Sequence, residues 1–152
     1  MSTTPLYLED LQIGDQFRSH EHTIDEAQIK AFAAEFDPQP FHLDDELAKG
    51  TLFGGLAASG WHTAAITMRL LVSISPPLAG GVIGAGGEVR WPIPTRPGDV
   101  LHVETEVLEI IPSRSKPERG MVSMRCLTRN QDGAVVQELV AKLVVARRPV
   151  AG

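Results

Sequence analysis

The sequence is poor in several features that define whole classes of protein. Its one cysteine, Cys126, excludes an internal disulfide and cannot alone build a zinc or iron–sulfur site. No apolar run approaches the roughly 20 residues of a membrane helix, and Met1–Asp10 lacks the basic and apolar regions of a signal peptide. Positive charge is also scarce, with 14 Lys and Arg against 19 Asp and Glu. We therefore expect a soluble, cytoplasmic protein with no overall attraction for nucleic acid or anionic membranes.

The remaining composition is that of an ordered globular chain. Of 152 residues, 43% are hydrophobic and 22% are charged. This length predicts a single domain over residues 1–152. The charge is uneven: residues 111–152 carry eight basic and three acidic side chains, whereas residues 1–110 carry six and sixteen. This asymmetry fits solvated faces of opposite sign. It also fits contact of Arg114, Lys116 and Arg119 with a phosphorylated ligand or acidic partner.

A short strand and a helix are expected near the start of the chain. Gln16–Thr23 has the pattern of a short polar strand. Apolar residues then recur at helical spacing over Ile24–Glu35. Thr23 followed by Glu26 three residues later is typical of a capping box at the start of a helix.

Prolines and acidic residues define the segment that follows. Pro38 and Pro40 prohibit continuation of the helix, so Asp37–Phe41 is expected to be an irregular loop. The acidic run Asp44–Glu46 then favours the start of a second short helix, because carboxylates suit the positive end of a helix dipole. Lys49–Gly50 is expected to close it.

An unusually apolar helix is expected at the centre of the chain. Thr51–Gly60 is rich in glycine and apolar residues, which indicates a closely packed loop. Ser59 can cap the helix that follows, with Gly60 in its first turn. Almost every residue of Trp61–Ser75 is apolar or small, so this helix is expected to be buried on most sides, and two prolines end it.

The second half of the chain has the pattern of long antiparallel strands. Asp132–Gly133 between two β-forming runs is a strong hairpin signal. Glycines in Gly81–Gly87 lack the spacing of a dinucleotide-binding motif and are expected to permit sheet curvature. The pattern predicts an α+β architecture, with a curved antiparallel sheet wrapped around the central helix. Four segments are expected to form its long strands: Gly81–Pro94, Val100–Ile111, Met121–Asn130 and Ala134–Arg147.

The segment Asp37-Pro38-Gln39-Pro40-Phe41-His42 is the strongest candidate for chemistry. It holds a carboxylate and an imidazole five residues apart in a loop that two prolines stiffen. Such a pair can share a water and activate it as a nucleophile. Gln39 can hydrogen-bond within the loop and hold its backbone. The alternative is an ordinary turn with a helix-capping Asp37 and a surface His42.

A second candidate lies where the apolar helix begins. A glycine in the first turn, Gly60, leaves its N–H unpaired and sterically open. With the helix dipole behind it, this N–H can bind an oxyanion that develops on a carbonyl. The alternative is a simple helix start with a glycine for close packing. His62 is expected to pack or bond locally, and Cys126 to be inert packing.

Together these two features resemble the MaoC-like dehydratases, which include the (R)-specific enoyl-CoA hydratases. The signature of that family is aspartate, any residue, Asn or Gln, proline, any residue and histidine, with an acidic residue two positions later. The sequence Ser59–Gly60–Trp61 follows at the expected distance. The resemblance covers roughly residues 8–147 and implies a hot-dog fold. Five residues match the signature in order: Asp37, Gln39, Pro40, His42 and Asp44.

The resemblance implies a hydro-lyase that adds water to enoyl thioesters, or removes it from 3-hydroxyacyl thioesters. Asp37 and His42 would hold the water, and the Gly60 N–H would bind the thioester carbonyl. The family often carries a Ser or Thr in the early central helix that orients the Asp. Here Ser59 and Thr63 are the candidates, because Ala65 occupies the usual position. The residues expected to bind substrate are Gln39, Ser59, Trp61 and Thr63.

The same resemblance implies partners and alternatives. The substrate would be an acyl-CoA or acyl-carrier-protein thioester, the chain would form a homodimer, and the basic residues 114–119 could meet the pantetheine phosphate. No metal or nucleotide cofactor is implied, and His20–Glu21–His22 lacks a third ligand. A hot-dog thioesterase is a second possibility, although residues 61–75 hold no Asp or Glu. A non-catalytic protein that binds acyl thioesters is a third.

Overall fold

The computed structural model describes residues 4–150. Within that part of the chain, no helix combines the length and apolar character needed to cross a bilayer. A 3-10 turn, η1 (Leu8–Asp10), precedes the other elements. The helices are α1 (Glu26–Phe36), α2 (Pro40–Leu43), α3 (Asp45–Ala48) and α4 (Gly60–Leu71). The strands are β1 (Gln16–Arg18), β2 (His22–Thr23), β3 (Ile83–Arg90), β4 (Val100–Pro112), β5 (Arg119–Arg129) and β6 (Val135–Ala146).

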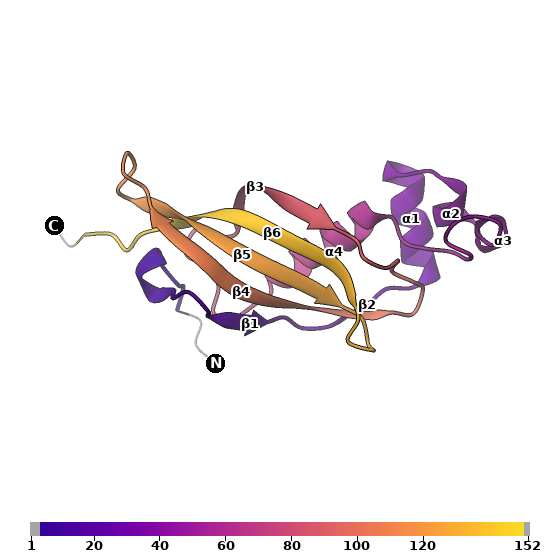
Figure 1. Cartoon of the computed structure of the whole chain (residues 1–152), viewed down its shortest axis with the longest axis horizontal. Coiled ribbons are helices and arrows are strands. Elements are labelled where there is room, and N and C mark those ends of the chain that lie inside the picture. Colours follow the sequence, from indigo (N-terminus) through magenta and orange to yellow (C-terminus); the bar gives the residue numbers. More distant parts are fainter. Residues whose placement is uncertain (1–3, 151–152) are drawn as a thin grey trace.

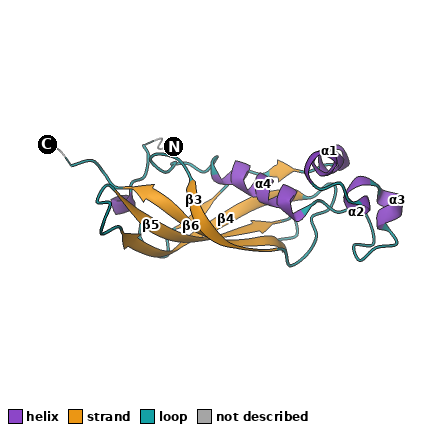
Figure 2. Ribbon diagram, turned by 90° about the horizontal axis from the view of Figure 1, so that it is seen from above, coloured by secondary structure: helices purple, strands orange, loops and turns teal. Residues whose placement is uncertain are grey.

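The strands form one antiparallel sheet in the order β1-β4-β5-β6-β3, with β2 pairing beside β1 on β4. The sheet curves, and α4 lies along its concave side, while α1, α2 and α3 gather at one end (Figures 1 and 2). The α+β hot-dog architecture expected from the sequence is therefore confirmed. The described part of the chain begins and ends toward the end of the sheet opposite α1, α2 and α3 (Figure 1).

The core lies between α4 and alternate residues of the three long strands. Side chains at alternate positions of β5, and of β4 as far as Val107, are buried, because successive residues of a strand face opposite sides of the sheet. Ile66 and Leu70 of α4 pack against this face. Burial of these apolar side chains supplies the main driving force for folding. The fully buried valines of the core are Val103, Val107, Val122, Val136 and Val145.

Glycines shape the sheet where the sequence predicts. The pairing of β3 with β6 slips by one residue between Gly84 and Gly86, which marks a β-bulge that bends the strand. A Cβ on Gly87 would lie 2.4 Å from the Val140 carbonyl oxygen, so only glycine allows this approach. At the β5–β6 hairpin, Gly133 has a φ of +78°. The hairpin expected at Asp132–Gly133 is confirmed.

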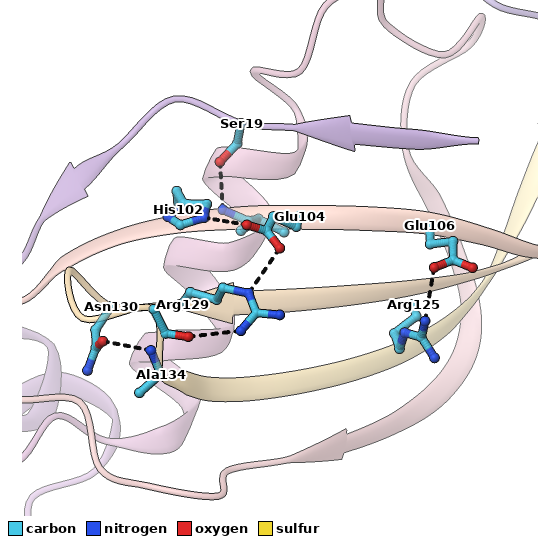
Figure 3. Close-up of polar contacts among 10 residues, drawn as sticks. Ser19, His102, Glu104, Glu106, Arg125, Arg129, Asn130 and Ala134 are labelled. Atoms are coloured by element: carbon cyan, nitrogen blue, oxygen red, sulfur yellow. Dashed lines mark hydrogen bonds and ion pairs between the residues drawn. The ribbon is translucent and has the colours of Figure 1, made fainter. Parts of the chain in front are cut away.

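Ion pairs between β4 and β5 join acidic residues of the first part of the chain to basic residues of the last part. Arg125 lies opposite Glu106 with a separation of 3.0 Å, and Arg129 contacts Glu104 at 2.9 Å (Figure 3). A hydrogen bond from His102 lowers the pKa of Glu104; burial opposes this and Arg129 adds to it. The acidic first part and the basic last part of the chain therefore meet across neighbouring strands.

Three helix boundaries differ from the sequence prediction. Helix α1 is capped by Asp25, whose carboxylate accepts from the Gln28 N–H at 2.8 Å, and not by Thr23, which belongs to β2. Within the expected loop, Pro40 begins the short helix α2, because proline is well tolerated at a first helical position. Helix α4 ends at Leu71 and not at Ser75.

The expectation that α4 is buried on most sides is wrong. His62, Thr63, Ile66, Thr67 and Leu70 are buried. On the other side of the helix, Trp61 is 61% exposed, Met68 43% and Val72 57%. The reason is that the concave sheet covers one side of the helix only, so the apolar residues of the other side have no cover within a single chain.

His62 packs locally, as the sequence predicts, and joins α4 to α1. Its ring stacks on Phe32 with the centroids 4.5 Å apart and the planes 3° from parallel. Burial, with a smaller contribution from the charge of His22, lowers its pKa from 6.5 to about 4. Its buried Nδ1 has no hydrogen-bond partner within residues 4–150. The ring is therefore neutral at pH 7 and acts as an aromatic spacer between the two helices.

Replacing Asp25 tests the start of α1. Asp25→Ala removes the acceptor of the Gln28 N–H and should lower the free energy of unfolding by about 1 kcal/mol. Thr23→Val is the matched control and should change it by less than about 0.5 kcal/mol. Urea denaturation of both variants measures the difference. A larger loss for Thr23→Val would contradict the assignment of the cap.

Replacing His62 tests the pH dependence of stability. Because its folded-state pKa lies below the unfolded value, its contribution is complete above about pH 6.5 and is lost as the pH falls toward 4. Between pH 7.5 and pH 5 the unmodified protein should lose about 1–2 kcal/mol more stability than His62→Phe, which keeps the aromatic stack. Denaturation at both pH values measures this. As a control, His20→Gln at an exposed position should leave the pH dependence of stability unaltered. If His62→Phe lost as much stability between pH 7.5 and pH 5 as the unmodified protein, the role of His62 would be refuted.

Candidate active site

Asp37 lies where α1 ends, and Gln39 holds it there. The Asp37 N–H donates to the Ala33 carbonyl at 2.8 Å, which closes the helix. The side-chain amide of Gln39 donates to Asp37 Oδ1 at 2.5 Å, and the Gln39 N–H donates to the Asp37 carbonyl at 2.8 Å. Gln39 therefore bonds within the loop, as the sequence predicts. These contacts leave Oδ2 free to face a different neighbour.

That neighbour is His42, on the short helix α2. The His42 side chain is buried, and its Nε2 lies 3.3 Å from Asp37 Oδ2. Its Nδ1 donates to the Ala57 carbonyl at 2.6 Å, which fixes both the tautomer and the direction of the ring. Phe41 and Phe53 pack on the ring, with centroids at 4.6 and 5.8 Å. Nε2 is thus the one ring nitrogen available to exchange a proton. The alternative of a surface histidine is excluded.

Opposing effects set the charge of Asp37. Burial raises the pKa of this carboxyl, but hydrogen bonds from Gln39 and Ser59 and the charge of His42 outweigh burial and lower it. The carboxylate is therefore ionised at neutral pH. Of the two hydroxyl candidates, Ser59 is the one that interacts with Asp37. The other candidate, Thr63, donates to Thr95 at 2.9 Å and has no part in this contact.

Ser59 also brings Asp37 beside the first turn of α4. It caps the helix: its hydroxyl accepts from the Trp61 N–H at 3.3 Å, and its carbonyl accepts from His62 and Thr63. Within residues 4–150, no protein group accepts a hydrogen bond from the Gly60 N–H. An ionised carboxylate, an imidazole and an unpaired N–H at a helix start thus share one neighbourhood. Such an arrangement can move a proton and stabilise negative charge on an oxygen.

The glycine at position 60 has a packing reason as well. A Cβ there would lie 2.7 Å from the indole of Trp91, closer than packed atoms approach. Trp91 in turn meets Trp61 edge to face, with centroids 5.2 Å apart. The alternative proposed from the sequence, a glycine for close packing, is therefore correct, and it is compatible with an open N–H.

An apolar cavity of about 600 Å³ lies between the uncovered side of α4 and the sheet. Trp61 lines it at one end, next in sequence to Gly60, whereas Asp37 and His42 do not line it. Its wall is mostly apolar, and its volume is sufficient for a small acyl group. The residues of α4 that line it are Trp61, Ala64, Met68 and Leu71.

The structure does not bring every candidate to this site. Residues 114–118 belong to the exposed turn between β4 and β5, and Arg119 begins β5, at the end of the sheet opposite α1 and α2 (Figure 1). Within one chain this places them at the opposite end of the sheet from the α1–α2 region that carries Asp37 and His42. The His20–Glu21–His22 segment also lies outside the site, since His22 bonds to Gln28 at 2.9 Å. No group of three or more metal-binding side chains gathers within residues 4–150.

Sequence reasoning missed Arg96 and Trp91, which hold the site from outside its motifs. The Arg96 guanidinium donates to the carbonyls of Phe53 and Gly55 at 2.5 and 2.9 Å, and so fixes the loop that presents Ala57 to His42. Both residues lie in the connection after β3, more than thirty positions from the segments they contact: Arg96 contacts the loop before α4, and Trp91 packs on Gly60 at the start of α4. No local sequence pattern predicts contacts between residues this far apart in the chain. The Pro-Gly-Asp turn beside Arg96 was the one available signal.

Comparisons with known proteins agree with this geometry. The family model described as "MaoC like domain" matches residues 10–128. A solved MaoC-like dehydratase from Rhodospirillum rubrum is 65% identical, with a TM-score of 0.93 over 95% of this chain and 99% of that one. The uncharacterized protein YdeM of Bacillus subtilis is 34% identical over 92% of this chain and 99% of its own length.

A third relative has a named activity. The 3-hydroxybutyryl-CoA dehydratase of Methylorubrum extorquens is 32% identical over 73% of this chain and 69% of its own length. The family model covers the elements that build the site, from α1 through α4 to β4 and β5. The fold, the two-proline loop and the glycine that begins α4 also agree with the expectation from the sequence. The chain therefore belongs to the MaoC-like dehydratase family.

Proposed function

We propose that this protein is a hydro-lyase of acyl thioesters, of the (R)-specific enoyl-CoA hydratase or 3-hydroxyacyl dehydratase type. The observation that carries the proposal is the 3.3 Å separation of Asp37 Oδ2 and His42 Nε2 beside the unpaired Gly60 N–H. The named activity of the Methylorubrum relative supports a short 3-hydroxyacyl-CoA as the first substrate to test. In this proposal the whole chain acts as one domain and needs no metal or nucleotide cofactor.

In the hydration direction, Asp37 and His42 hold one water molecule between them. Oδ2 and Nε2 are farther apart than a strong charge-assisted hydrogen bond, so both keep capacity for that water. The pair removes a proton from the water as its oxygen forms a bond to C3 of the enoyl group. A proton is then returned to C2, so that H and OH are added in balance. Dehydration follows the same steps in reverse.

Negative charge moves onto the thioester carbonyl oxygen as C3 is attacked. The Gly60 N–H donates to this oxygen, with the dipole of α4 behind it. A donor fixed in advance at such a position typically lowers the barrier by about 3 kcal/mol. Ser59 stabilises the ionised Asp37, Gln39 holds its second oxygen, and Trp61 leads the acyl group toward the apolar cavity.

Replacing Asp37 and His42 tests the proposal. With crotonyl-CoA, the unmodified protein should remove the enoyl absorbance without releasing a thiol. Asp37→Asn and His42→Ala should each lower kcat/KM by about 10²–10⁴-fold, because each removes a proton-transfer group. Enoyl absorbance and a thiol reagent follow the reaction, and circular dichroism checks folding.

The exposed His20, changed to Ala, is the control and should keep full activity. Thiol release would instead favour a thioesterase, and tight binding of crotonyl-CoA without turnover would favour a non-catalytic acyl-thioester-binding protein. Full activity in either site variant would refute the assignment of Asp37 and His42. Acyl-carrier-protein thioesters tested in parallel decide between the two carriers.

We also propose that two copies form the working unit. The uncovered side of α4 carries Trp61, Met68 and Val72, and β3, the neighbouring edge strand, is exposed along most of its length. An exposed strand edge beside an apolar patch favours pairing with another chain. Because this patch borders the cavity and follows Gly60 directly, a second copy would close the site from the open side.

Placing a charge on this patch tests the dimer. Light scattering should give the unmodified protein about twice its 16.4 kDa chain mass. Met68→Glu should give the single-chain mass, because a carboxylate cannot be buried there without a partner. The matched control is Ile111→Glu, which charges an exposed apolar residue at the far end of β4. A Met68→Glu dimer, or an unmodified monomer, would contradict the proposed interface.

A further inference from the structure

We propose that Trp91, tethered by Gln137, is a positioning residue that holds the Gly60 N–H in place for catalysis. The proposal rests on the function proposed above, in which this N–H binds the thioester carbonyl. Neither Trp91 nor Gln137 belongs to the signature that identifies the family. The support comes from a closed series of contacts that begins and ends on α4.

The first contact is between Trp91 and Gly60. Three atoms of the indole, Cδ2, Cε2 and Cζ2, would lie 2.7–2.9 Å from a Cβ on Gly60. The indole thus occupies the space where any other residue would have a side chain. Packing this close fixes the glycine backbone from one side, while the Ser59 contacts with Asp37 and with the Trp61 N–H fix it from the other.

The second contact fixes the indole itself. Trp91 Nε1 donates to Gln137 Oε1 at 2.8 Å, and Gln137, on β6, is fully buried. The Gln137 amide donates to Thr67 Oγ1 at 3.0 Å, and that hydroxyl lies 2.6 Å from Thr128 Oγ1 and 2.9 Å from the Thr63 carbonyl. Because Thr67 lies two turns after Gly60 on α4, the helix positions the ring that packs on its own first residue.

The network is polar, although apolar side chains of similar volume could fill the same part of the core. A buried amide and two buried hydroxyls stabilise a fold only when all their hydrogen bonds are made, and an apolar set of similar volume has no such requirement. What the polar set adds is direction: it permits one orientation of the indole, although Trp91 is itself 38% exposed. A catalytic donor must be held within a few tenths of an ångström, and this network limits the movement of Gly60 accordingly.

Two single variants and their combination test the tether. Gln137→Met keeps the volume but removes the acceptor, and Trp91→Phe keeps an aromatic ring but removes the N–H. Each should lower kcat on crotonyl-CoA by about tenfold with little change in KM, because the N–H acts mainly in the transition state. The double variant should match Trp91→Phe alone, since both changes remove the same hydrogen bond and only Trp91→Phe also changes the ring that packs on Gly60.

Val136→Ala is the matched control, because Val136 is the fully buried neighbour of Gln137 on β6 and its loss lowers stability without freeing the indole. It should keep the kcat of the unmodified protein at a temperature where it is folded. An unchanged kcat in Gln137→Met, additive losses in the double variant, or an equal loss in Val136→Ala would each overturn the proposal.

A readout that needs no activity separates this inference from the proposed function. The indole ring current should shift the NMR signals of the Gly60 Hα protons upfield, and Gln137→Met should reduce that shift while Val136→Ala preserves it. If the unmodified protein turns over no enoyl thioester, the proposed function fails, and the catalytic part of this inference fails with it. If turnover is normal but the Gly60 signals do not respond to Gln137→Met, the tether alone is refuted.

Discussion

The hydrogen bond from His42 Nδ1 to the Ala57 carbonyl, 2.6 Å long, is the constraint on which the site depends. It joins α2 to the loop that leads into α4, two segments fifteen residues apart. Once this bond is made, Nε2 has one direction left, toward Asp37, and the start of α4 lies alongside. A single backbone acceptor therefore decides which ring nitrogen of His42 can meet water, because the other nitrogen is held in a structural hydrogen bond.

Most of the other contacts at this end of the molecule protect that arrangement. Arg96 fixes the loop that carries Ala57, Ser59 both caps α4 and stabilises Asp37, and the stack of His62 on Phe32 sets the distance between α4 and α1. These groups come from three separate segments of the chain. The extended core of the sheet holds the three segments in register, because each leads into or packs against a buried strand or helix.

The features that the sequence predicts correctly depend on short-range signals. Prolines after α1, the Ser59–Gly60 helix start and the Asp132–Gly133 turn each act through the φ and ψ angles of one or two residues, so sequence reasoning identified them. The cap of α1 was misassigned because Thr23 and Asp25 are both good caps, and pairing of β2 with β4 decides between them. The Trp91 tether and the clamp by Arg96 join residues 40–70 positions apart, and the exposed side of α4 depends on where the sheet ends. No local sequence pattern predicts either feature. Ser59 was offered as a partner of Asp37 by the family resemblance, together with Thr63, and the structure decides between the two.

The ion pairs between β4 and β5 have a consequence for how the chain assembles. The turn that joins these strands, residues 113–118, is exposed and lies where the acidic part of the chain gives way to the basic part. A protein nicked there would yield two fragments of opposite net charge whose facing strands carry complementary side chains. Such fragments would be drawn together before any backbone pairing began, and salt would slow their reunion.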